Sequence, residues 1–357
     1  MTQCNREVSF QPNLSPEQSE KNLSALLVRG AIQNSSLNRA IDRLDERFRS
    51  YCSFYSQGLW TPGLVITNEM RGSTEQYLPM IEIHSAFRQF FSLALRYPLP
   101  DESDPVQGAT NWLDLLQRLL LSQESLNPAT LLKILITDES RRRLFLFRSL
   151  LPKHHGGSFL RYPSQLVVLE DWIIRKRNSL SRGIRCLDAA CGSGEGTYDL
   201  AKLLLQCGIP PCAQQVHGSS LEPLEVFSAA HGYFPHDPQR EKRFKAFVEP
   251  LFATHTISNM LFFRDTVMRQ PTPDEKPYDI ILCNGLLGGP FLHDRTMLEN
   301  ALIALTKRLN KGGIFLATDR FHGGWKKGGS QGFLAEFMKR KGFLIRHGDY
   351  GIAAEKI

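Results

Sequence analysis

The stretch CLDAACGSGEGTY (residues 186–198) decides the fold of this chain. A short apolar run ends at Asp188, glycines follow at positions 192, 194 and 196, and a helical pattern continues to residue 206. Glycine has no Cβ, so it lets the backbone turn sharply and approach a ligand closely. The helix after the loop offers free backbone amides in its first turn. Because strand, loop and helix come in this order, the stretch predicts a nucleotide-binding loop at the edge of a sheet.

The rest of the C-terminal half alternates in the same way. We expect strands where short apolar runs occur, at residues 184–190, 214–221, 260–264, 278–283, 314–318 and 343–347. We expect helices in the amphipathic stretches between them, at residues 196–206, 224–230, 295–309 and 332–341. Strands that alternate with helices form a doubly wound parallel sheet, which binds ligands beyond the carboxyl ends of its strands. The predicted class is α/β, with a Rossmann-like doubly wound domain over residues 156–357.

The first half of the chain has a different texture. Residues 1–20 are polar and contain two prolines, which predicts a loosely held tail. Apolar residues then recur at helical spacing, which predicts a mainly α-helical domain over residues 21–155. Its expected helices cover residues 21–44, with a turn near 34–36, and residues 81–95, 110–121 and 128–151.

The composition excludes several classes of protein. With 42% hydrophobic and 22% charged residues, a chain of 357 residues is typical of a globular protein with two domains. It contains neither the run of about 18 apolar residues that a membrane span needs nor an apolar signal peptide, so we expect a cytoplasmic location. The seven cysteines lack metal-ligand spacing, so we expect no metal site. A net charge of +7 permits an acidic partner or nucleic acid, but no nucleic-acid motif accompanies it.

The glycine loop distinguishes between two kinds of nucleotide-binding domain. Dinucleotide-binding domains carry G-x-G-x-x-G, whereas here the third glycine comes one position early. The segment LDAACGSG (residues 187–194) instead resembles the first motif of class I S-adenosyl-L-methionine (SAM)-dependent methyltransferases, an apolar residue followed by D-x-G-x-G-x-G. The resemblance implies SAM as the cofactor, held by Asp188, Ala190, Cys191, Gly192 and Gly194. A simpler interpretation also stays open, in which Asp188 only accepts hydrogen bonds from the loop amides.

Three further segments resemble later landmarks of the same family. They are SSLEP (residues 219–223), PYDIILCN (277–284) and LNKGGIFL (309–316), which resemble the end of its second strand, its fourth strand and the turn before its fifth strand. In that family an acid after the second strand binds the ribose hydroxyls. Glu222 is our ribose candidate, with Ser220 beside it, and helix capping is the alternative for Glu222.

Two more polar residues follow expected strands. Asp265 follows the third of them and is expected near the adenine amino group, with helix capping equally open. Asn284 ends the fourth expected strand and is assigned to the site, both as a cofactor ligand and as a catalytic residue.

A narrower resemblance concerns chemotaxis-receptor glutamate methyltransferases. The segment AACGSGEGTYDLA (residues 189–201) is similar to their AACSTGEEPYSIA loop, and GSFLR (157–161) is similar to their TxFFR segment. The resemblance implies that Arg161 lies beside the methyl donor and acceptor and that Glu195 binds the amino group of the methionine part. An exposed arginine and a glutamate favoured by the helix dipole are the simpler interpretations.

The sequence also departs from that narrower family. Ser220 and Glu222 stand where the family has two aspartates, and the run NGLLGGPF (residues 284–291) lacks the tyrosine of the family's active site. The receptor-glutamate substrate therefore does not follow from the resemblance.

The predicted function is methyl transfer from SAM by in-line displacement, in which the protein mainly supplies proximity and orientation. The acceptor is unknown. No strong base stands in residues 284–291, which favours an acceptor that needs none, such as a carboxylate on an acidic protein. Two alternatives stay open: a non-catalytic SAM-binding regulatory module, and a methyltransferase that acts on RNA or a small metabolite.

Overall fold

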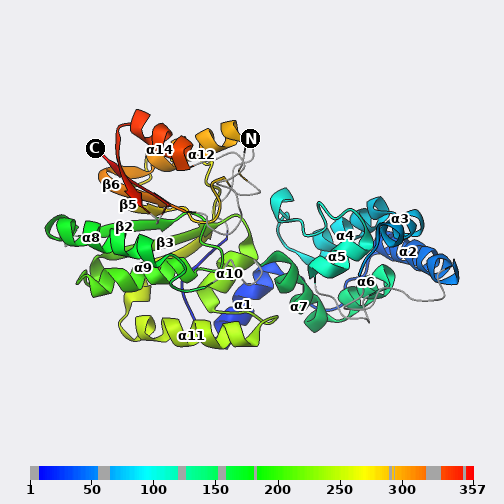
Figure 1. Ribbon diagram of the computed structural model, residues 1–357. Helices are drawn as coiled ribbons and strands as arrows, with labels where there is room; N and C mark the ends of the chain where they lie inside the picture. Colours follow the sequence, from blue (N-terminus) through cyan, green and yellow to red (C-terminus); the bar gives the residue numbers. More distant parts are fainter. Residues whose placement is uncertain are drawn as a thin grey trace. The chain divides into compact units, whose positions relative to one another are not determined.

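The chain divides into two units in the computed structural model (Figure 1). The sheet unit combines Met1–Ser19 with Leu151–Ile357, and the helical unit is Glu20–Leu150. The structure describes residues 8–54, 65–119, 126–151, 158–180, 183–288, 292, 294–318, 331–348 and 351–357. Within these ranges, no helix is long and apolar enough to cross a membrane.

The sheet unit is built on one mixed sheet with the order β1-β4-β3-β2-β5-β6-β8-β7 in the described part of the chain. Its strands are β1 (Ser9–Phe10), β2 (Ile184–Asp188), β3 (Gln214–Ser220), β4 (Met260–Arg264), β5 (Tyr278–Leu282), β6 (Leu309–Ala317), β7 (Phe343–Gly348) and β8 (Gly351–Lys356). Neighbouring strands from β4 to β6 are parallel, and β8 is antiparallel to both β6 and β7.

This strand order defines the fold. When the parallel strands β2 to β7 are counted along the chain, their order is that of the doubly wound Rossmann sheet, 3-2-1-4-5-6. The antiparallel β8 is inserted between the last two, which distinguishes the sheet from the uninterrupted dinucleotide-binding form. The order reverses between β2 and β5, where such sheets bind their ligands. The prediction of an α/β, Rossmann-like doubly wound domain is confirmed.

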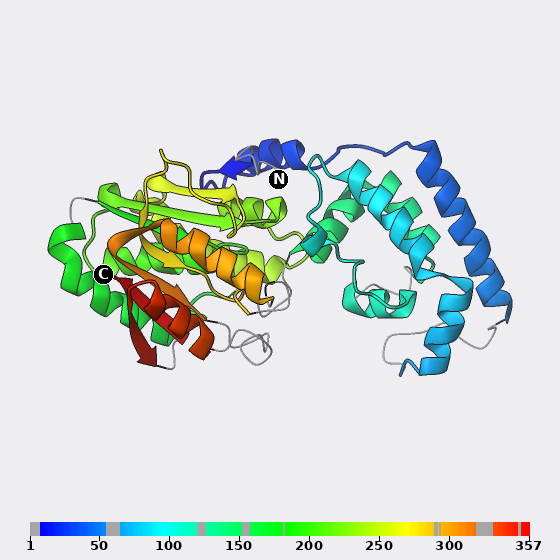
Figure 2. The ribbon, with the colours of Figure 1, turned by 90° about the horizontal axis from the view of Figure 1, so that it is seen from above.

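Helices cover both faces of this sheet. They are α8 (Pro163–Leu180), α9 (Glu195–Gln206), α10 (Pro223–His231), α11 (Pro238–Ala253), α12 (Arg295–Lys307) and α14 (Gln331–Arg340), with short 3-10 turns at Pro211–Ala213 and Thr256–Asn259. On one face α12 and α14 share a core with Leu187, Ile281 and Phe315, and they lie in front of the strands when seen from above (Figure 2). On the other face α9 packs against β2 and β3, and α11 packs against α9 (Figure 1).

Five of the six predicted strands agree with the structure to within two residues at each end, whereas β6 begins at Leu309, five residues before the predicted start. Four described helices and strands of the sheet unit were not predicted: α8, α11, β1 and β8. Helix α8 has no single apolar stripe, because Val167 and Ile174 are 57% and 56% exposed while Trp172 is buried. Helix α11 does carry signals that could have been used. Pro238 is its first residue, and Asp237 before it accepts a hydrogen bond from the Arg240 amide.

Residues before α1 (Pro16–Leu26) belong to the sheet unit. Ser9 and Phe10 pair antiparallel with Phe263 and Phe262 of β4. The amide of Asn13 donates to the Ala230 carbonyl. The interpretation of residues 1–20 as a loose tail did not anticipate this pairing, because a two-residue strand leaves almost no periodic pattern.

The helical unit contains the rest of α1 and the helices α2 (Ser35–Phe54), α3 (Asn68–Tyr77), α4 (Met80–Ala94), α5 (Trp112–Leu119), α6 (Pro128–Thr137) and α7 (Glu139–Leu150), with a 3-10 turn at Asp101–Ser103. Buried aromatic rings fill its core, among them Phe87, Phe91, Trp112 and Phe145. The single helix expected over residues 128–151 is two helices, because Asp138 accepts a hydrogen bond from the Arg141 amide and starts a new one.

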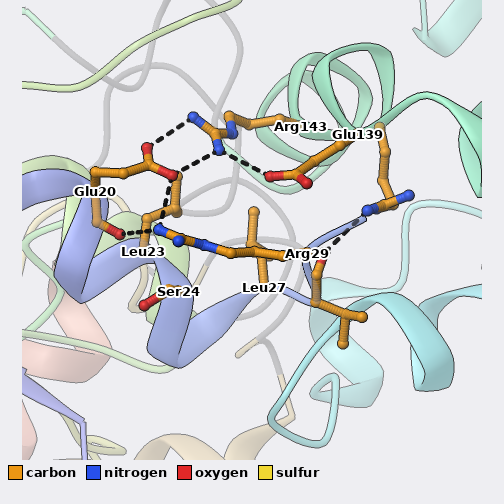
Figure 3. Close-up of a pocket in the computed structure, with 9 residues that line it drawn as sticks. Glu20, Leu23, Ser24, Leu27, Arg29, Glu139 and Arg143 are labelled. Atoms are coloured by element: carbon orange, nitrogen blue, oxygen red, sulfur yellow. Dashed lines mark hydrogen bonds and ion pairs between the residues drawn. The ribbon is translucent and has the colours of Figure 1, made fainter. Parts of the chain in front are cut away.

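Charged side chains tie α1 to α7 within the helical unit (Figure 3). Glu20 pairs with Arg29 and Arg143, and Arg143 also pairs with Glu139. The cavity beside them measures about 10 Å³, which is room for about one water molecule. These ion pairs therefore hold α1 and α7 together within the helical unit.

Candidate functional site

A cavity lies at the switch point of the sheet, between the carboxyl ends of β2 and β5. Asp188 pairs with Leu282 in the register of these two strands, and both line the cavity. The other lining residues come from the turn before α8, from α8 itself, from the glycine loop, from α9 and from the end of β5; they are Ser158, Arg161, Tyr162, Gln165, Leu166, Ala190, Cys191, Glu195, Gly196, Asp199 and Asn284. Six of the predicted site residues thus meet in one cavity: Arg161, Asp188, Ala190, Cys191, Glu195 and Asn284.

The glycine loop between β2 and α9 depends on two left-handed backbone positions. Gly192 has φ of 52° and Gly194 has φ of 91°, which side chains with a Cβ rarely adopt. A Cβ on Gly194 would also stand 2.7 Å from the Cβ of Ala229, so this glycine lets α9 pack closely on α10. A Cβ on Gly192 would meet no atom within 4 Å. Gly192 therefore has open space in front of it, as a close approach by a ligand requires.

Asp188 is a buried acid at the end of β2. Its Oδ2 accepts a hydrogen bond of 2.8 Å from the Thr197 hydroxyl, and the Ala190 amide also donates to the carboxylate. Burial raises the pKa of Asp188 to about 6, against the lowering effect of these hydrogen bonds. Asp188 therefore both accepts a hydrogen bond from a loop amide and lines the cavity.

Glu195, the first residue of α9, is held by a buried ion pair. Arg240 of α11 donates to its Oε1 at 2.6 and 3.1 Å, and the Ser193 hydroxyl donates to its Oε2 at 2.9 Å. Arg240 also lies over the Phe234 ring. Glu195 borders the cavity as expected, but each of its carboxylate oxygens already accepts a hydrogen bond from the protein. Sequence reasoning missed Arg240 because it did not predict α11.

Asp199, one turn further along α9, was missed entirely. Its side chain is 6% exposed and lines the cavity. Oδ2 accepts a hydrogen bond of 2.6 Å from the Leu160 amide, while Oδ1 has no hydrogen-bond partner among the described residues. Burial raises the pKa of Asp199 to about 7. The i, i+4 spacing from Glu195 puts both acids on one helix face, and this spacing could have identified Asp199 from the sequence.

Residues 158–161 form the turn beside Asp199. Leu160 has φ of 55°, a strained value for leucine, and its amide is the donor to Asp199. The Phe159 ring stacks on Phe247 of α11 with centroids 3.7 Å apart. Arg161 is half-buried at the cavity, so it is not the fully exposed arginine of the simpler interpretation. Gly157, the first residue of the predicted segment, lies outside the described residues.

Asn284 bonds reciprocally with Gln165 of α8. Asn284 Nδ2 donates to Gln165 Oε1 at 2.8 Å, and Gln165 Nε2 donates to Asn284 Oδ1 at 3.1 Å. The Thr318 amide donates to the same Oδ1 at 3.1 Å. This amide pair fixes one wall of the cavity. Residues 289–291 of the run that follows Asn284 lie outside the described part of the chain.

The two ribose candidates at the end of β3 do not line this cavity. Glu222 is the N-cap of α10, and its Oε1 accepts a hydrogen bond from the Leu224 amide. The Ser220 hydroxyl donates to Glu225, a half-buried acid that sequence reasoning did not single out. Burial raises the pKa of Glu225 to about 7. The capping role considered for Glu222 is therefore present in the structure.

Asp265 is held by arginines rather than turned to the cavity. Arg269 donates to both of its carboxylate oxygens, at 2.7 and 2.9 Å, and Arg308 lies 3.2 Å from Oδ2. Arg269 also pairs with Glu275. Asp265 is thus part of a buried ion network, which gives it a structural role where an adenine contact was expected.

The charges of the cavity define what it can bind. Three acids line it, Asp188, Glu195 and Asp199, together with the cation Arg161, and Arg240 pairs with Glu195. A negative lining attracts a cationic group, and more strongly where water is partly excluded. Among the described residues, no group of His, Cys, Asp and Glu side chains could hold a metal ion. The excess of acids over the one lining cation, Arg161, favours a ligand with a positively charged group over a phosphate.

Comparisons with known proteins give a likeness of fold. No family model matches the chain, and no curated protein matches it significantly. Among solved structures it is similar to the magnesium protoporphyrin IX methyltransferase of Synechocystis PCC 6803 with bound SAM (11% identity, 77% of this chain, 97% of that chain, TM-score 0.37). It is also similar to an rRNA methylase of Streptococcus thermophilus (14%, 53%, 95%, 0.32) and to the N-methyltransferase NodS of Bradyrhizobium japonicum (14%, 54%, 94%, 0.32). At these identities and TM-scores, the likeness supports no inference about what this chain binds.

Proposed function

We propose that the protein is a SAM-dependent methyltransferase whose sheet unit binds SAM in the cavity at the β2–β5 switch point. The observation that carries this proposal is the position of the segment LDAACGSG (residues 187–194). Its acid, Asp188, ends β2 inside a cavity at the point where the strand order reverses. Ligands of doubly wound sheets bind at this point, and the loop that follows has the conformation that lets a ligand approach the backbone.

Charge supports SAM over a dinucleotide. SAM carries positive charge on its sulfonium and its ammonium group, and the cavity presents the carboxylates of Asp188, Glu195 and Asp199. A dinucleotide would instead bring its negative pyrophosphate toward these acids, where like charges repel. The inserted antiparallel β8 also separates the sheet from the dinucleotide-binding form.

The residues that we propose to hold the cofactor are Asp188 and the backbone of Ala190, Cys191, Gly192 and Gly194. Glu222 stays our candidate for the ribose hydroxyls, because a carboxylate can accept hydrogen bonds from both of them while Oε1 caps α10. Asp265 is left out of this set, because Arg269 and Arg308 bind its oxygens.

The chemistry of this site is mainly positional. SAM supplies an activated methyl group when it is bound, and in-line displacement requires the acceptor to be held in line with it. We assign the donor side of this alignment to Arg161 and the acceptor side to Asn284, whose amide is fixed by Gln165. The run of residues 284–291 contains no titratable side chain, so a carboxylate acceptor on an acidic protein stays the favoured class.

One experiment distinguishes this proposal from its two alternatives, a methyltransferase that acts on RNA or a small metabolite and a non-catalytic SAM-binding regulatory module. Incubation with radiolabelled SAM and size-fractionated cell extract would place the label on protein, on RNA or on a small metabolite. Binding of SAM without transfer to any fraction would favour the regulatory module instead. Treatment of labelled protein with mild base distinguishes a methyl ester, which is hydrolysed, from a methylated amine, which is stable.

Gly192→Phe tests the cofactor site directly. We expect the variant to lose S-adenosylhomocysteine (SAH) binding in calorimetry, because the new side chain occupies the open space in front of the loop. Gly342→Phe is the matched control, since Gly342 also has a positive φ of 82° and a Cβ added there would meet no atom within 4 Å, but it follows α14, whereas Gly192 directly follows Cys191 of the cavity lining. Unchanged SAH affinity in a folded Gly192→Phe protein would refute the assignment.

A further inference from the structure

The unusual feature of the cavity is the carboxylate of Asp199. Its side chain is 6% exposed, and its Oδ2 is bound by the Leu160 amide. Its Oδ1 has no hydrogen-bond partner among the described residues. A buried acceptor without a donor costs about 1–3 kcal/mol, and more when it is charged. A buried carboxylate oxygen that lacks a donor in the described part of the chain, on a residue that lines the cavity, therefore indicates a donor that arrives with a ligand.

Glu195 differs from Asp199 in this respect, although both lie on the same face of α9. Arg240 and the Ser193 hydroxyl bind the two oxygens of Glu195. A ligand cation at Glu195 would have to compete with a buried guanidinium, whereas a cation at Asp199 Oδ1 would displace no protein donor among the described residues. The open position of the pair is Asp199.

The groups around Asp199 carry charges of both signs. Asp188 from β2 and Glu195 from α9 add negative charge, while Lys202 from α9 opposes them. The Lys202 ammonium lies 4.5 Å from the centre of the Phe247 ring. Arg161, from the turn that Asp199 anchors, lines the same cavity. The wall thus combines an anion and a cation, which is the complement of a zwitterionic amino-acid group.

We propose that Asp199 Oδ1 pairs with the ammonium group at the amino-acid end of SAM or SAH, with Arg161 facing the carboxylate of that end. This inference rests on the proposed function and assigns to Asp199 the role that the sequence had assigned to Glu195. Because the Leu160 amide is bound by the same carboxylate, Asp199 also joins the ligand to the turn that carries Arg161. Asp199 thus binds the ligand and also holds the turn of residues 158–161 in place.

A pH dependence follows from the burial of Asp199. Only the ionised carboxylate pairs with an ammonium, and burial raises the pKa of Asp199 to about 7. We therefore expect SAH affinity to fall as the pH drops from about 8 to about 6, through that pKa. A ligand without the amino-acid end makes no such contact, so its affinity is not expected to depend on Asp199.

Asp199→Asn tests the proposal with two ligands, SAH and 5′-methylthioadenosine, which lacks the amino-acid end. Asparagine can still accept the Leu160 hydrogen bond, but it places no negative charge at the Oδ1 position. In calorimetry at pH 8 we expect SAH to bind about 10- to 100-fold more weakly, the range for a hydrogen bond between charged groups. Binding of 5′-methylthioadenosine is expected to stay within about twofold, which reports that the cavity is intact. Asp171→Asn, at an exposed position of α8, is the control substitution.

The outcomes separate this inference from the proposed function. If the unchanged protein binds neither ligand, the SAM site itself is wrong. If the unchanged protein binds SAH but Asp199→Asn binds it equally well, or loses both ligands together, the role of Asp199 is wrong and the SAM site stands. A pH dependence of SAH affinity between pH 8 and pH 7 that is as steep in Asp199→Asn as in the unchanged protein would likewise overturn the assignment.

Discussion

Each unit of the molecule contains a buried charged side chain, and the two side chains differ in how many of their polar atoms have hydrogen-bond partners. In the helical unit Arg142 is 1% exposed and donates to the carbonyls of Leu135, Val28 and Gly30. In the sheet unit Asp199 is 6% exposed and keeps Oδ1 without a donor from the described residues. Of these two charges, the one with a full set of partners supports the fold, and the one that lines a cavity and lacks a donor is the candidate for a ligand. The comparison separates structural charges from candidate binding charges within one chain.

The largest expected effect concerns Arg142, the structural charge of this comparison. Arg142→Met leaves three backbone carbonyls without their donor, and we expect the free energy of unfolding of the helical unit to fall by about 3–5 kcal/mol. Urea denaturation followed by circular dichroism measures this loss. Arg141→Met removes a neighbouring exposed arginine and is expected to change stability by less than about 0.5 kcal/mol. Equal losses in the two variants would contradict the structural role of Arg142.

Glu222 is the intermediate case, since it caps α10 through Oε1 and is also our ribose candidate. We expect Glu222→Ala to weaken SAH binding by about 1.5–3 kcal/mol, the range for hydrogen bonds to a charged group. Glu222→Asp, a residue that also caps helices well, separates the two roles because its shorter side chain retains the cap better than the ribose contact. A loss of SAH affinity below a few tenths of a kcal/mol would leave Glu222 with the cap alone.

A further expected effect concerns the stability cost of burying the Asp199 carboxylate. Burial raises the pKa of Asp199 from 3.8 to about 7, so the folded state disfavours the ionised form. Below about pH 3 the group is protonated in both states, and no penalty arises. As the pH rises toward 7 and above, the unfolded state loses its proton first, and the unliganded protein loses stability.

Asp199→Asn removes this penalty. We expect the unliganded variant to be more stable than the unchanged protein by up to about 4 kcal/mol at pH 8 and equally stable at about pH 3. Asp188 and Glu225 also have a raised pKa, but they are present in both proteins, so the difference reports Asp199. Thermal unfolding at the two pH values measures it. A variant that is less stable at pH 8 would assign Asp199 to the structural group.

Local sequence determined the sheet and its loop. Buried parallel strands are short apolar runs, and a glycine loop between strand and helix has a fixed order, so β2 to β7 and α9 could be located from residue type alone. The switch point and the placement of Asp188 at it follow from that order. The signal is strong in β4 (MLFFR) and β5 (YDIIL), which are mainly apolar, whereas β3 (QQVHGSS) contains a single large apolar residue, Val216.

Tertiary structure decided which polar groups are open. The sequence put Glu195 and Asp199 on one helix, yet only the position of Arg240, 45 residues later, shows that Glu195 is already paired. Likewise Arg269 and Arg308 form ion pairs with Asp265. Gln165 forms hydrogen bonds with Asn284, which lies 119 residues later in the chain. Hydrogen-bond satisfaction depends on contacts between residues that are distant along the chain. Periodicity and motifs describe neighbours in sequence, so they identify which acids lie near the site, and only the fold decides which of them retains a free oxygen.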